Sequence, residues 1–396
     1  MKYDVIVIGI GSMGSAASYH LAKRGCRVLG LEQFNIGHDL GSSHGINRII
    51  RLAYAENPAY VPLVRRAYEL WRQLESVSGE QLLIVTGGID AGPPDGAIVQ
   101  GSLRSCREHQ LRHEELDANE LHRRFPGYRL PADMAAVFQP DAGFVLSERA
   151  VICYAAAAQA LGATIHAREP VKRWFVKGGA VIVETGNDSY IASKLVITAG
   201  PWAAKLVPEL RTNRLAVPER QVMIWTQPRK PELFQVGAFP VFNMEELDGT
   251  RVSRYYGFPA YGIPGFKLGK YHHRNERVDP DRMDRECHPQ DERVLRTAIR
   301  RYFPEANGPT MAMKTCLFTN SLDEDFVLDL HPEFSQVSIA AGFSGHGFKF
   351  SSVVGEIMAD LALTGQSQHL NDDLFSITRK RKKLDYSIRT GSVGAR

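Results

Sequence analysis

Residues 4–32 read DVIVIGIGSMGSAASYHLAKRGCRVLGLE, and this stretch decides the fold. Its first part, residues 4–8, is rich in Val and Ile and has the length of a buried parallel strand. Residues 15–24 have the composition of a helix and are followed by a glycine. Residues 27–31 have the pattern of a second strand, which finishes on Glu32. The stretch therefore predicts a complete strand–helix–strand unit.

Three glycines with the spacing GxGxxG separate the first strand from the helix. Gly9 permits a tight turn, Gly11 lets the backbone approach a pyrophosphate, and Gly14 lets the helix pack on the strand. The helix N-terminus would face the phosphates, and the Glu32 carboxylate can reach ribose hydroxyls. A glycine turn can also be merely structural, but this context predicts dinucleotide binding. A carboxylate at position 32 disfavours a 2′-phosphate, and hence NADP.

The composition limits the remaining choices. The chain has 396 residues, of which 44% are hydrophobic and 23% charged, as expected for a folded protein of two domains. A net charge of +4 is too small to argue for nucleic-acid or membrane binding. Five cysteines without a CxxC pair, and a start without a secretion signal, favour a reducing compartment. We therefore expect a cytoplasmic protein.

A second apolar strand, residues 195–200 (LVITAG), ends in a turn of small residues that can let the backbone meet a cofactor closely. An ordinary buried strand would look the same in isolation. No second GxGxxG occurs in the chain. A flavin reductase that takes hydride from a nicotinamide usually needs two such sites, so a single one favours a flavoprotein that is reoxidised by a small molecule.

Outside these parallel strands, the sequence pattern predicts further helices and the strands of a second sheet. Residues 60–77 and 147–161 have the pattern of core helices. Strand-like segments of a second sheet are 221–225, 253–256 and 266–271, and helical spacing returns at 293–303 and 352–363. The predicted fold class is α/β (α+β). We expect a Rossmann-like nucleotide-binding domain and a discontinuous second domain built on a mostly antiparallel sheet.

Five further segments carry residue types that can do chemistry. They are GSSHGINRIIR at 41–51, YYGFP at 255–259, KLGKYHH at 267–273, KTCLFTN at 314–320 and GFSGHGFK at 342–349. In these segments the chain resembles the family of monomeric sarcosine oxidase and N-methyltryptophan oxidase, FAD-dependent amine oxidases of the D-amino-acid-oxidase superfamily. The resemblance runs from Tyr3 to about Thr378, and its most specific part is 323–349.

The resemblance implies a bound FAD, attached through its 8α-methyl group to Cys316. The positions that match the cofactor-binding residues are Gly9, Gly11, Ser12, Met13, Gly14, Glu32, Ser42, His44, Arg48, Val171, Ala199, Gly200, Trp202, Cys316, Gly345, Gly347, Phe348 and Lys349. The helix that begins near Ser351 is expected to point its positive end at the flavin. We expect an FAD-binding domain of residues 1–80, 145–217 and 320–385, a substrate-binding domain of 81–144 and 218–319, and a tail of 386–396.

The same resemblance assigns roles around the substrate. Arg51 and Lys349 match the pair that grips the substrate carboxylate, for which a planar fork and a point charge are well suited. Tyr256 matches a tyrosine of the active site. Arg48 matches a cation on the opposite flavin face, and Lys267 matches a lysine that promotes reaction with oxygen by stabilising superoxide charge.

Two positions depart from the family pattern. A tyrosine two residues after the flavin cysteine is replaced by Phe318. The active-site histidine of the family follows its lysine by four residues, whereas His272 and His273 follow Lys267 by five and six. A shift of one residue turns a strand side chain to the other face. Either a bulge at Lys270 restores His272 to the catalytic role, which we favour, or the role has moved.

Other chemistries fit less well. The segment 342–345 lacks the GxSxG spacing of a hydrolase, and adjacent histidines on a strand point apart, so no metal site is expected at His272, His273 and Glu276. The sequence favours a monomeric FAD-dependent oxidase of secondary amines, most of all N-methyl amino acids, acting on CH–NH donors with O2 as acceptor and H2O2 as product. A flavin dehydrogenase that passes electrons to a carrier, or a non-catalytic flavin-binding module, are the alternatives. Which amine is oxidised stays open.

Overall fold

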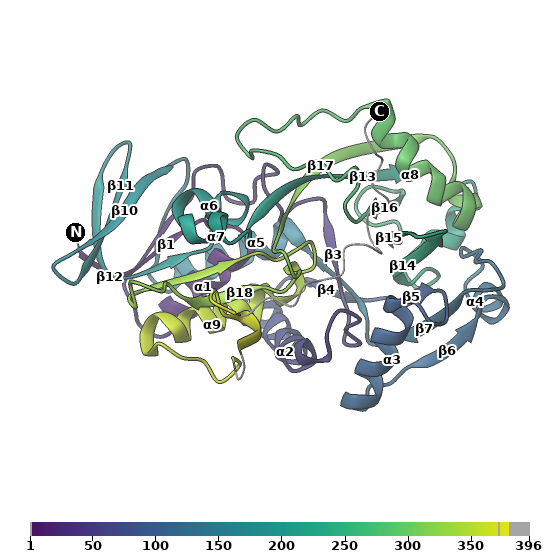
Figure 1. Ribbon diagram of the computed structural model, residues 1–396, viewed down its shortest axis with the longest axis horizontal. Helices are drawn as coiled ribbons and strands as arrows, with labels where there is room; N and C mark the ends of the chain where they lie inside the picture. The colour runs from purple at the N-terminus through teal and green to yellow at the C-terminus, as the bar shows by residue number, and fades with distance from the viewer. Residues whose placement is uncertain (1, 371–372, 380–396) are drawn as a thin grey trace.

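The computed structural model describes residues 2–370 and 373–379 as two large sheets with a small one between them (Figure 1). The predicted tail, 386–396, lies outside the described residues. The sheet at the left of Figure 1 carries the amino-terminal strands, and the sheet at the right carries most strands from the middle of the chain. This mixed architecture confirms the predicted fold class.

The first sheet has eight strands, in the order β10-β11-β12-β1-β2-β9, and β19 and β18 continue it beside the second half of β12. Its strands are β1 (Lys2–Ile8), β2 (Val28–Leu31), β9 (Thr164–His166), β10 (Val171–Lys177), β11 (Ala180–Thr185), β12 (Ser189–Ile197), β18 (Val327–Leu330) and β19 (Val337–Ala341). β1 is parallel to both β2 and β12, and β12 is parallel to β19. The carboxyl ends of four parallel strands, β1, β2, β12 and β19, therefore meet at one edge.

The predicted strand–helix–strand unit is confirmed by β1, α1 (Ser12–Lys23) and β2. The helix begins three residues earlier than expected, because Gly11 is its N-cap and the glycine turn leads directly into its first turn. A Cβ atom on Gly14 would lie 1.8 Å from the Gly9 carbonyl oxygen, so only glycine permits this contact between turn and helix.

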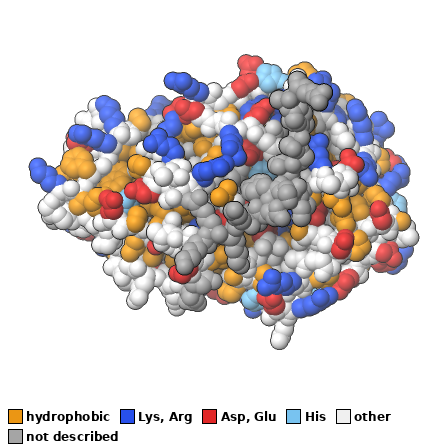
Figure 2. Space-filling view, viewed as in Figure 1, with side chains coloured by type: hydrophobic (Ala, Val, Ile, Leu, Met, Phe, Trp, Pro, Cys, Tyr) orange, Lys and Arg blue, Asp and Glu red, His pale blue; other side chains and the backbone are white. Residues whose placement is uncertain are grey.

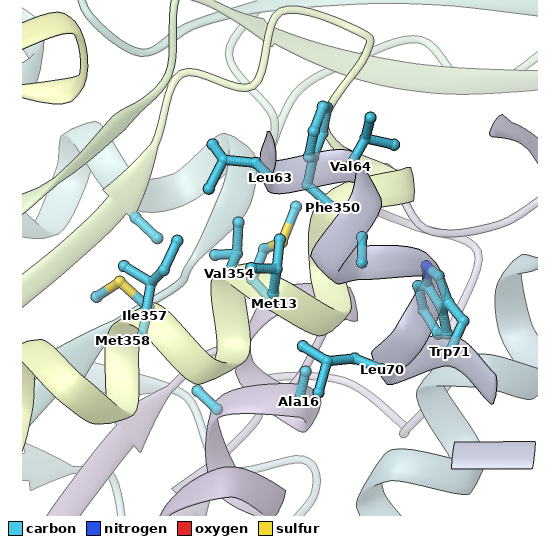
Figure 3. Close-up of a cluster of buried hydrophobic side chains, with 14 of the residues drawn as sticks. Met13, Ala16, Leu63, Val64, Leu70, Trp71, Phe350, Val354, Ile357 and Met358 are labelled. Carbon is cyan, nitrogen blue, oxygen red and sulfur yellow. The ribbon is translucent and has the colours of Figure 1, made fainter. Parts of the chain in front are cut away.

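Helices from distant parts of the chain bury their apolar faces together beside this sheet. α1 packs against α5 (Ser147–Ala160) and α9 (Ser351–Thr364), and α9 also packs against α2 (Val61–Ser78). Figure 3 shows Met13 and Ala16 of α1 close to Leu63, Val64, Leu70 and Trp71 of α2 and to Phe350, Val354, Ile357 and Met358 at or before α9. Since each buried aliphatic or aromatic side chain stabilises by about 2 kcal/mol, this cluster fixes α9 relative to α1.

The second sheet has eight strands, in the order β17-β13-β16-β15-β14-β5-β7-β6. Its strands are β5 (Gly88–Gly92), β6 (Glu114–Asp117), β7 (Ala135–Gln139), β13 (Val217–Thr226), β14 (Val241–Asp248), β15 (Arg251–Phe258), β16 (Phe266–Lys270) and β17 (Thr310–Asn320). All neighbours are antiparallel except β14 and β5. The helices α3 (Ala97–His109), α4 (Ala118–Arg124) and α8 (Pro289–Tyr302) cover it.

A sheet of three strands, β3-β8-β4, completes the strands of the described residues. They are β3 (Asn47–Ile50), β4 (Leu83–Val85) and β8 (Gly143–Leu146), and the remaining short helices are α6 (Ala203–Leu206), α7 (Pro208–Thr212) and 3-10 turns at Pro58–Tyr60, Gly200–Trp202, Pro231–Phe234, Pro304–Ala306, Phe348–Phe350 and Asp373–Phe375. No helix within the described ranges has the length and apolar character needed to cross a membrane. Basic and acidic side chains are interspersed over the face shown in Figure 2, as the small net charge leads one to expect.

Candidate active site

A cavity of about 290 Å³ lies at the carboxyl ends of the parallel strands of the first sheet. This is the position at which open α/β sheets bind their ligands. Fourteen of the sequence-predicted cofactor residues line it: Gly9, Gly11, Ser12, Met13, Glu32, Ser42, Arg48, Val171, Ala199, Gly200, Trp202, Gly345, Gly347 and Phe348. They come from the amino-terminal unit, from the turn after β12 and from the segment after β19, so the fold brings together parts of the chain that are far apart in sequence.

The glycine turn and α1 form the end of this cavity that suits phosphates. The N-cap residue Gly11 has no side chain to cap α1, and the backbone N–H of Ser12 donates only a long hydrogen bond, of 3.4 Å, to the hydroxyl of Ser43. Such N–H groups, together with the positive end of the helix dipole, favour an anion. Gly14 lies beneath this turn and acts through helix packing rather than through contact with the cavity.

Glu32 is buried at the wall of the same cavity, at the end of β2. Its carboxylate accepts hydrogen bonds from the backbone N–H of Ile10, at 2.8 Å, and of Phe34, at 3.0 Å. These bonds fix both oxygens while leaving them further acceptor capacity, because a carboxylate oxygen can accept two hydrogen bonds. The residue is therefore held where an adenosine ribose could be hydrogen-bonded.

Cys316 reaches this region from the other half of the molecule, on β17. Its side chain is buried, and its sulfur lies 3.5 Å from Nη2 of Arg48. Arg48 is held by the carbonyl oxygens of Ser42 and Asn47, each 3.0 Å away, and it lines the large cavity. The next residues along the strand, Leu317 and Phe318, line the cavity as well. The thiol is thus adjacent to the cavity wall, beside a fixed cation.

His44 lies behind this wall, and neither of its ring nitrogens has a hydrogen-bond partner among the described residues. Burial and then the charge of Arg48 lower the pKa of His44 to about 3, so its ring is neutral. Two unsatisfied nitrogens in a buried ring are unusual. Both ring nitrogens of His44 can therefore form a further hydrogen bond beside the cavity.

A smaller cavity adjoins the large one and shares Arg48, Phe318, Gly345 and Phe348 with it. The predicted substrate residues Arg51, Tyr256 and Lys349 all line this smaller cavity. The structure therefore brings the three together beside the shared wall, although they come from the residue after β3, from β15 and from the turn before α9.

Arg51 is tied to a carboxylate in the structure. Its Nη2 lies 2.9 Å from Glu56, and its Nη1 donates to the carbonyl oxygen of Ala53 at 2.8 Å. Burial opposes ionisation of Glu56, but the guanidinium outweighs burial and holds the pKa of that carboxyl at about 2. A ligand carboxylate at Arg51 would thus compete with Glu56.

Lys349 is buried with a single hydrogen bond from Nζ, to the carbonyl oxygen of His346 at 2.7 Å. Burial and then the charge of Arg51 lower the pKa of Lys349 to about 7. The backbone carbonyl of Lys349 accepts a hydrogen bond of 2.9 Å from the indole N–H of Trp71. This bond connects the lysine directly to the helix cluster of Figure 3.

Lys267 does not face either cavity. Its Nζ donates to the carbonyl oxygens of Gly45 and Asn47, at 2.7 and 2.9 Å, and to the side-chain oxygen of Asn47, at 2.8 Å. Burial and then the charge of Arg48 hold its pKa well below the usual range. Lys267 lies behind the segment that carries His44 and Arg48.

The bulge expected at Lys270 is absent, and that prediction is wrong. β15 and β16 pair in regular register from Tyr255↔Lys270 to Phe258↔Lys267. Tyr271 follows Lys267 by four residues, and because side chains alternate along a strand, the two residues lie on the same face of the sheet. Tyr271 lines the smaller cavity. Its ring lies 5.3 Å from that of Tyr256 and 5.6 Å from that of Phe318.

His272 lies in the turn after β16, with φ 52°, rather than on a strand. Its Nδ1 is 3.1 Å from both carboxylate oxygens of Glu219, and its Nε2 is 3.4 Å from Glu324. Burial lowers its pKa, but the two carboxylates outweigh burial and raise it to about 9. His273 turns instead to Asp291, at 3.0 Å. His272 is thus a charged residue outside the lining of the smaller cavity.

Three polar residues of the smaller cavity were not singled out from the sequence: Asn243, Tyr271 and His346. His346 bonds to the hydroxyl of Tyr54 and to the carbonyl oxygen of Glu324, and burial lowers its pKa to about 4, so it is neutral. The alternation from Lys267 through Gly269 could have identified Tyr271. No local signal marks Asn243, which faces the cavity only because β14 pairs with β15.

The fold and the cavities are those of a flavin-dependent oxidoreductase, and comparison with known proteins agrees. The family described as FAD dependent oxidoreductase (DAO) matches residues 4–361, and the chain belongs to this family. The large cavity fits FAD in its glycine turn, in the buried acid at the end of β2 and in its second wall from residues 342–348.

The relatives cover the chain almost completely. Monomeric sarcosine oxidase of Bacillus sp. (strain B-0618) is 41% identical over 384 residues, which are 96% of this chain and 97% of that one. N-methyl-L-tryptophan oxidase of Salmonella heidelberg (strain SL476) is 37% identical over 365 residues, 92% of this chain and 95% of that one. The solved structure of NikD, an unusual amino acid oxidase, in its open form has 26% identity and a TM-score of 0.80, covering 95% and 97% of the two chains.

Proposed function

We propose that this protein is an oxidase of secondary amines, with N-methyl amino acids as substrates and O2 as electron acceptor. The observation that carries the proposal is the adjacency of the two cavities: the cations Arg51 and Lys349 lie in a small chamber that shares a wall with the cofactor cavity. The two relatives described above, which are named for sarcosine and for N-methyl-L-tryptophan, support this substrate class.

A bound FAD would supply the two-electron chemistry, namely removal of the equivalent of a hydride from the carbon next to the substrate nitrogen and reduction of O2 to hydrogen peroxide. The imine left by the substrate hydrolyses to an aldehyde and a demethylated amine. We propose that the residues lining the large cavity hold the cofactor, that His44 and Lys349 assist them, and that Cys316 is linked to its 8α-methyl group. The buried thiol beside Arg48 supports the linkage.

The substrate carboxylate binds Arg51 and the protonated form of Lys349, which places the amine near the shared wall. A bidentate guanidinium and an ammonium are the strongest carboxylate partners that side chains offer. Tyr256 and Tyr271 confine the substrate from β15 and from the end of β16, and burial raises the pKa of Tyr271, so its phenol stays protonated. Arg48 faces both cavities and supplies positive charge at their junction.

We propose for Lys267 a role in the reaction with oxygen, through the segment 45–48 that it fixes and through positive charge when it is protonated. His272 is proposed to act at the outer side of the substrate chamber rather than on the reacting nitrogen. The protein is proposed to be monomeric, as the name of its sarcosine-oxidising relatives states for them, and cytoplasmic, in agreement with its five free cysteines.

The experiment that tests the proposal measures both the release of hydrogen peroxide and the state of the flavin. N-methyl amino acids added in air should release hydrogen peroxide, and the same substrates without oxygen should bleach the flavin. Yellow colour should stay with the acid-precipitated protein and leave it in Cys316→Ser, whereas Cys153→Ser, a buried cysteine on α5, should keep it. Bleaching of the flavin without release of peroxide would show that the protein is a dehydrogenase rather than an oxidase. A colourless protein that cannot be reconstituted with FAD would reject both functions.

A further inference from the structure

Asn243 lines two of the cavities. One is the smaller cavity, which is the proposed substrate chamber, and the other is a second chamber of about 100 Å³. These two chambers share Asn243, Tyr271 and His346, whereas no described residue lines both the second chamber and the large cofactor cavity. A substrate whose amine lies beside the cofactor cavity therefore has Asn243 near its other groups.

Regular strand pairing fixes the direction of the Asn243 side chain. On β14, Asn243 is the partner of Asp90 on β5 and of Tyr256 on β15. Because side chains alternate between the two faces of a sheet, directly paired residues lie on the same face. Asp90, Asn243 and Tyr256 thus form a row across three strands. Since Tyr256 lines the substrate chamber, this row lies on the face of the sheet that faces the substrate.

Asp90 determines which end of the Asn243 amide faces the chamber. The Asp90 side chain is buried and accepts hydrogen bonds from Ser102, at 2.6 Å, from Gln139, at 2.9 Å, and from Nδ2 of Asn243, at 3.1 Å. The oxygen that accepts from Asn243 also lies 3.6 Å from Nε of Arg51. Because a guanidinium can only donate, this oxygen is an acceptor, and the NH2 end of the amide must face it. The amide oxygen of Asn243 therefore points away from Asp90.

This amide oxygen is an acceptor that the protein leaves unused. Only 5% of Asn243 is exposed, yet among residues 2–370 and 373–379 no donor is hydrogen-bonded to its oxygen. The other amide at Asp90 differs, since the oxygen of Gln139 accepts from the backbone N–H of Ala53 at 2.8 Å. Neighbouring His346 cannot serve as donor, because both of its ring nitrogens are already hydrogen-bonded. A buried oxygen without a donor is costly, and a ligand that supplies one removes this cost.

We infer that Asn243 accepts a hydrogen bond from a hydroxyl or N–H group on the side chain of the substrate and thereby determines which amines are preferred. The inference rests on the proposed function, because it takes the substrate carboxylate to lie at Arg51. Since one oxygen of Asp90 contacts both Arg51 and Asn243, the acceptor lies close to the carboxylate anchor. The preferred substrates are therefore N-methyl amino acids with a short side chain that carries a hydrogen-bond donor.

Two pairs of substrates with the same shape test the inference. N-methyl-L-serine is compared with N-methyl-L-2-aminobutyrate, and N-methyl-L-homoserine with N-methyl-L-norvaline, so that in each pair a hydroxyl replaces a methyl group. Peroxide release should give a kcat/KM about fivefold higher for the hydroxyl member of at least one pair, because one net hydrogen bond is gained. A wall without an acceptor would favour the methyl member. Equal values in both pairs, or a preference for the methyl member in both, would overturn the inference.

Variants assign the preference to the oxygen of Asn243. Asn243→Leu keeps the approximate shape of the side chain and removes the acceptor, so the methyl member of each pair should become the better substrate. Ser102→Ala is the matched control, because it removes another hydrogen bond to Asp90 from a residue that lines neither chamber. Its ratio of kcat/KM within each pair should stay within about twofold of the natural protein's. A ratio that Asn243→Leu leaves unchanged, or that Ser102→Ala abolishes as well, would overturn the assignment.

Binding without turnover gives an independent readout. The acid 4-hydroxybutyrate has a hydroxyl where valerate has a methyl group, and 3-hydroxypropionate differs from butyrate in the same way. Calorimetric titration into the flavin-loaded protein should show about fivefold tighter binding of the hydroxy acid in at least one pair, and the reverse order in Asn243→Leu. If no amine releases peroxide but this difference is found, the proposed function fails while the acceptor site stands. Equal or weaker binding of both hydroxy acids would reject the acceptor site even if N-methyl amino acids are oxidised.

Discussion

The large cavity and the smaller cavity beside it are built in different ways. One wall of the large cavity is mainly backbone from consecutive residues, 8–13, between β1 and α1. The smaller cavity is lined by residues of strands β3, β14, β15 and β17, by Tyr271 after β16 and by the segment around residue 346. A site made of consecutive backbone depends on a few glycines, whereas a site made of side chains depends on the pairing of distant strands.

The largest effect is expected at Gly14. Gly14→Ala places a methyl group against the Gly9 carbonyl oxygen, whose distance of 1.8 Å from the added Cβ leaves no room. We expect a loss of about 3 kcal/mol or more in the free energy of unfolding, because backbone on both sides must move. Thermal unfolding and the amount of flavin per chain measure this.

Gly11→Ala is the matched control, since its Cβ would meet only the hydroxyl of Ser43 at 3.8 Å. The flavin-free protein should unfold within about 2 °C of the natural one, while flavin content falls because the methyl group enters the phosphate end of the cavity. Equal stability losses in the two variants would mean that the glycines have one common role.

An effect of intermediate size is expected in the pH dependence of carboxylate binding, which depends on the protonation of Lys349. Its pKa of about 7 means that the ammonium is present below pH 7 and is lost as the pH rises through that value. Binding of butyrate to the flavin-loaded protein should therefore weaken by about tenfold between pH 6 and pH 9. Lys349→Arg should bind butyrate equally at both pH values, because a guanidinium stays charged. Calorimetric titration measures both, and a flat profile in the natural protein would remove Lys349 from the carboxylate site.

The smallest effect distinguishes two neighbouring residues. Tyr271→Phe removes a hydroxyl from a residue that lines the substrate chamber, so kcat/KM for an N-methyl amino acid should fall by about fivefold. His272→Gln changes a residue outside that chamber and should alter it by less than about twofold. The reverse order of effects would return the catalytic role to His272.

The amino-terminal unit could be predicted because its signals are local. The strand at 4–8, the glycines and the acid at position 32 lie within one short stretch, and each acts on its neighbours. The division of the chain into an FAD-binding domain and a substrate-binding domain stays a proposal. The second sheet was expected in kind, although its parallel pair, β14 with β5, has no local signal.

The lining of the smaller cavity could be predicted only in part from the sequence. Resemblance to the family identified Arg51, Tyr256 and Lys349, which do lie together, but it directed attention to His272 because it matched residue type rather than strand face. Tyr271 faces the chamber because the pairing of β15 and β16 is regular, and regularity of pairing is a tertiary property.

The hydrogen bond from Trp71 to the carbonyl of Lys349 has a consequence for anyone who wishes to redesign this protein. Trp71 is fully buried in a helix cluster, so Lys349 cannot be displaced without disturbing that cluster. Arg251, at the start of β15, is exposed and tolerates exchange far better. Libraries of variants aimed at new amine substrates should leave Lys349 unchanged and vary exposed positions such as Arg251.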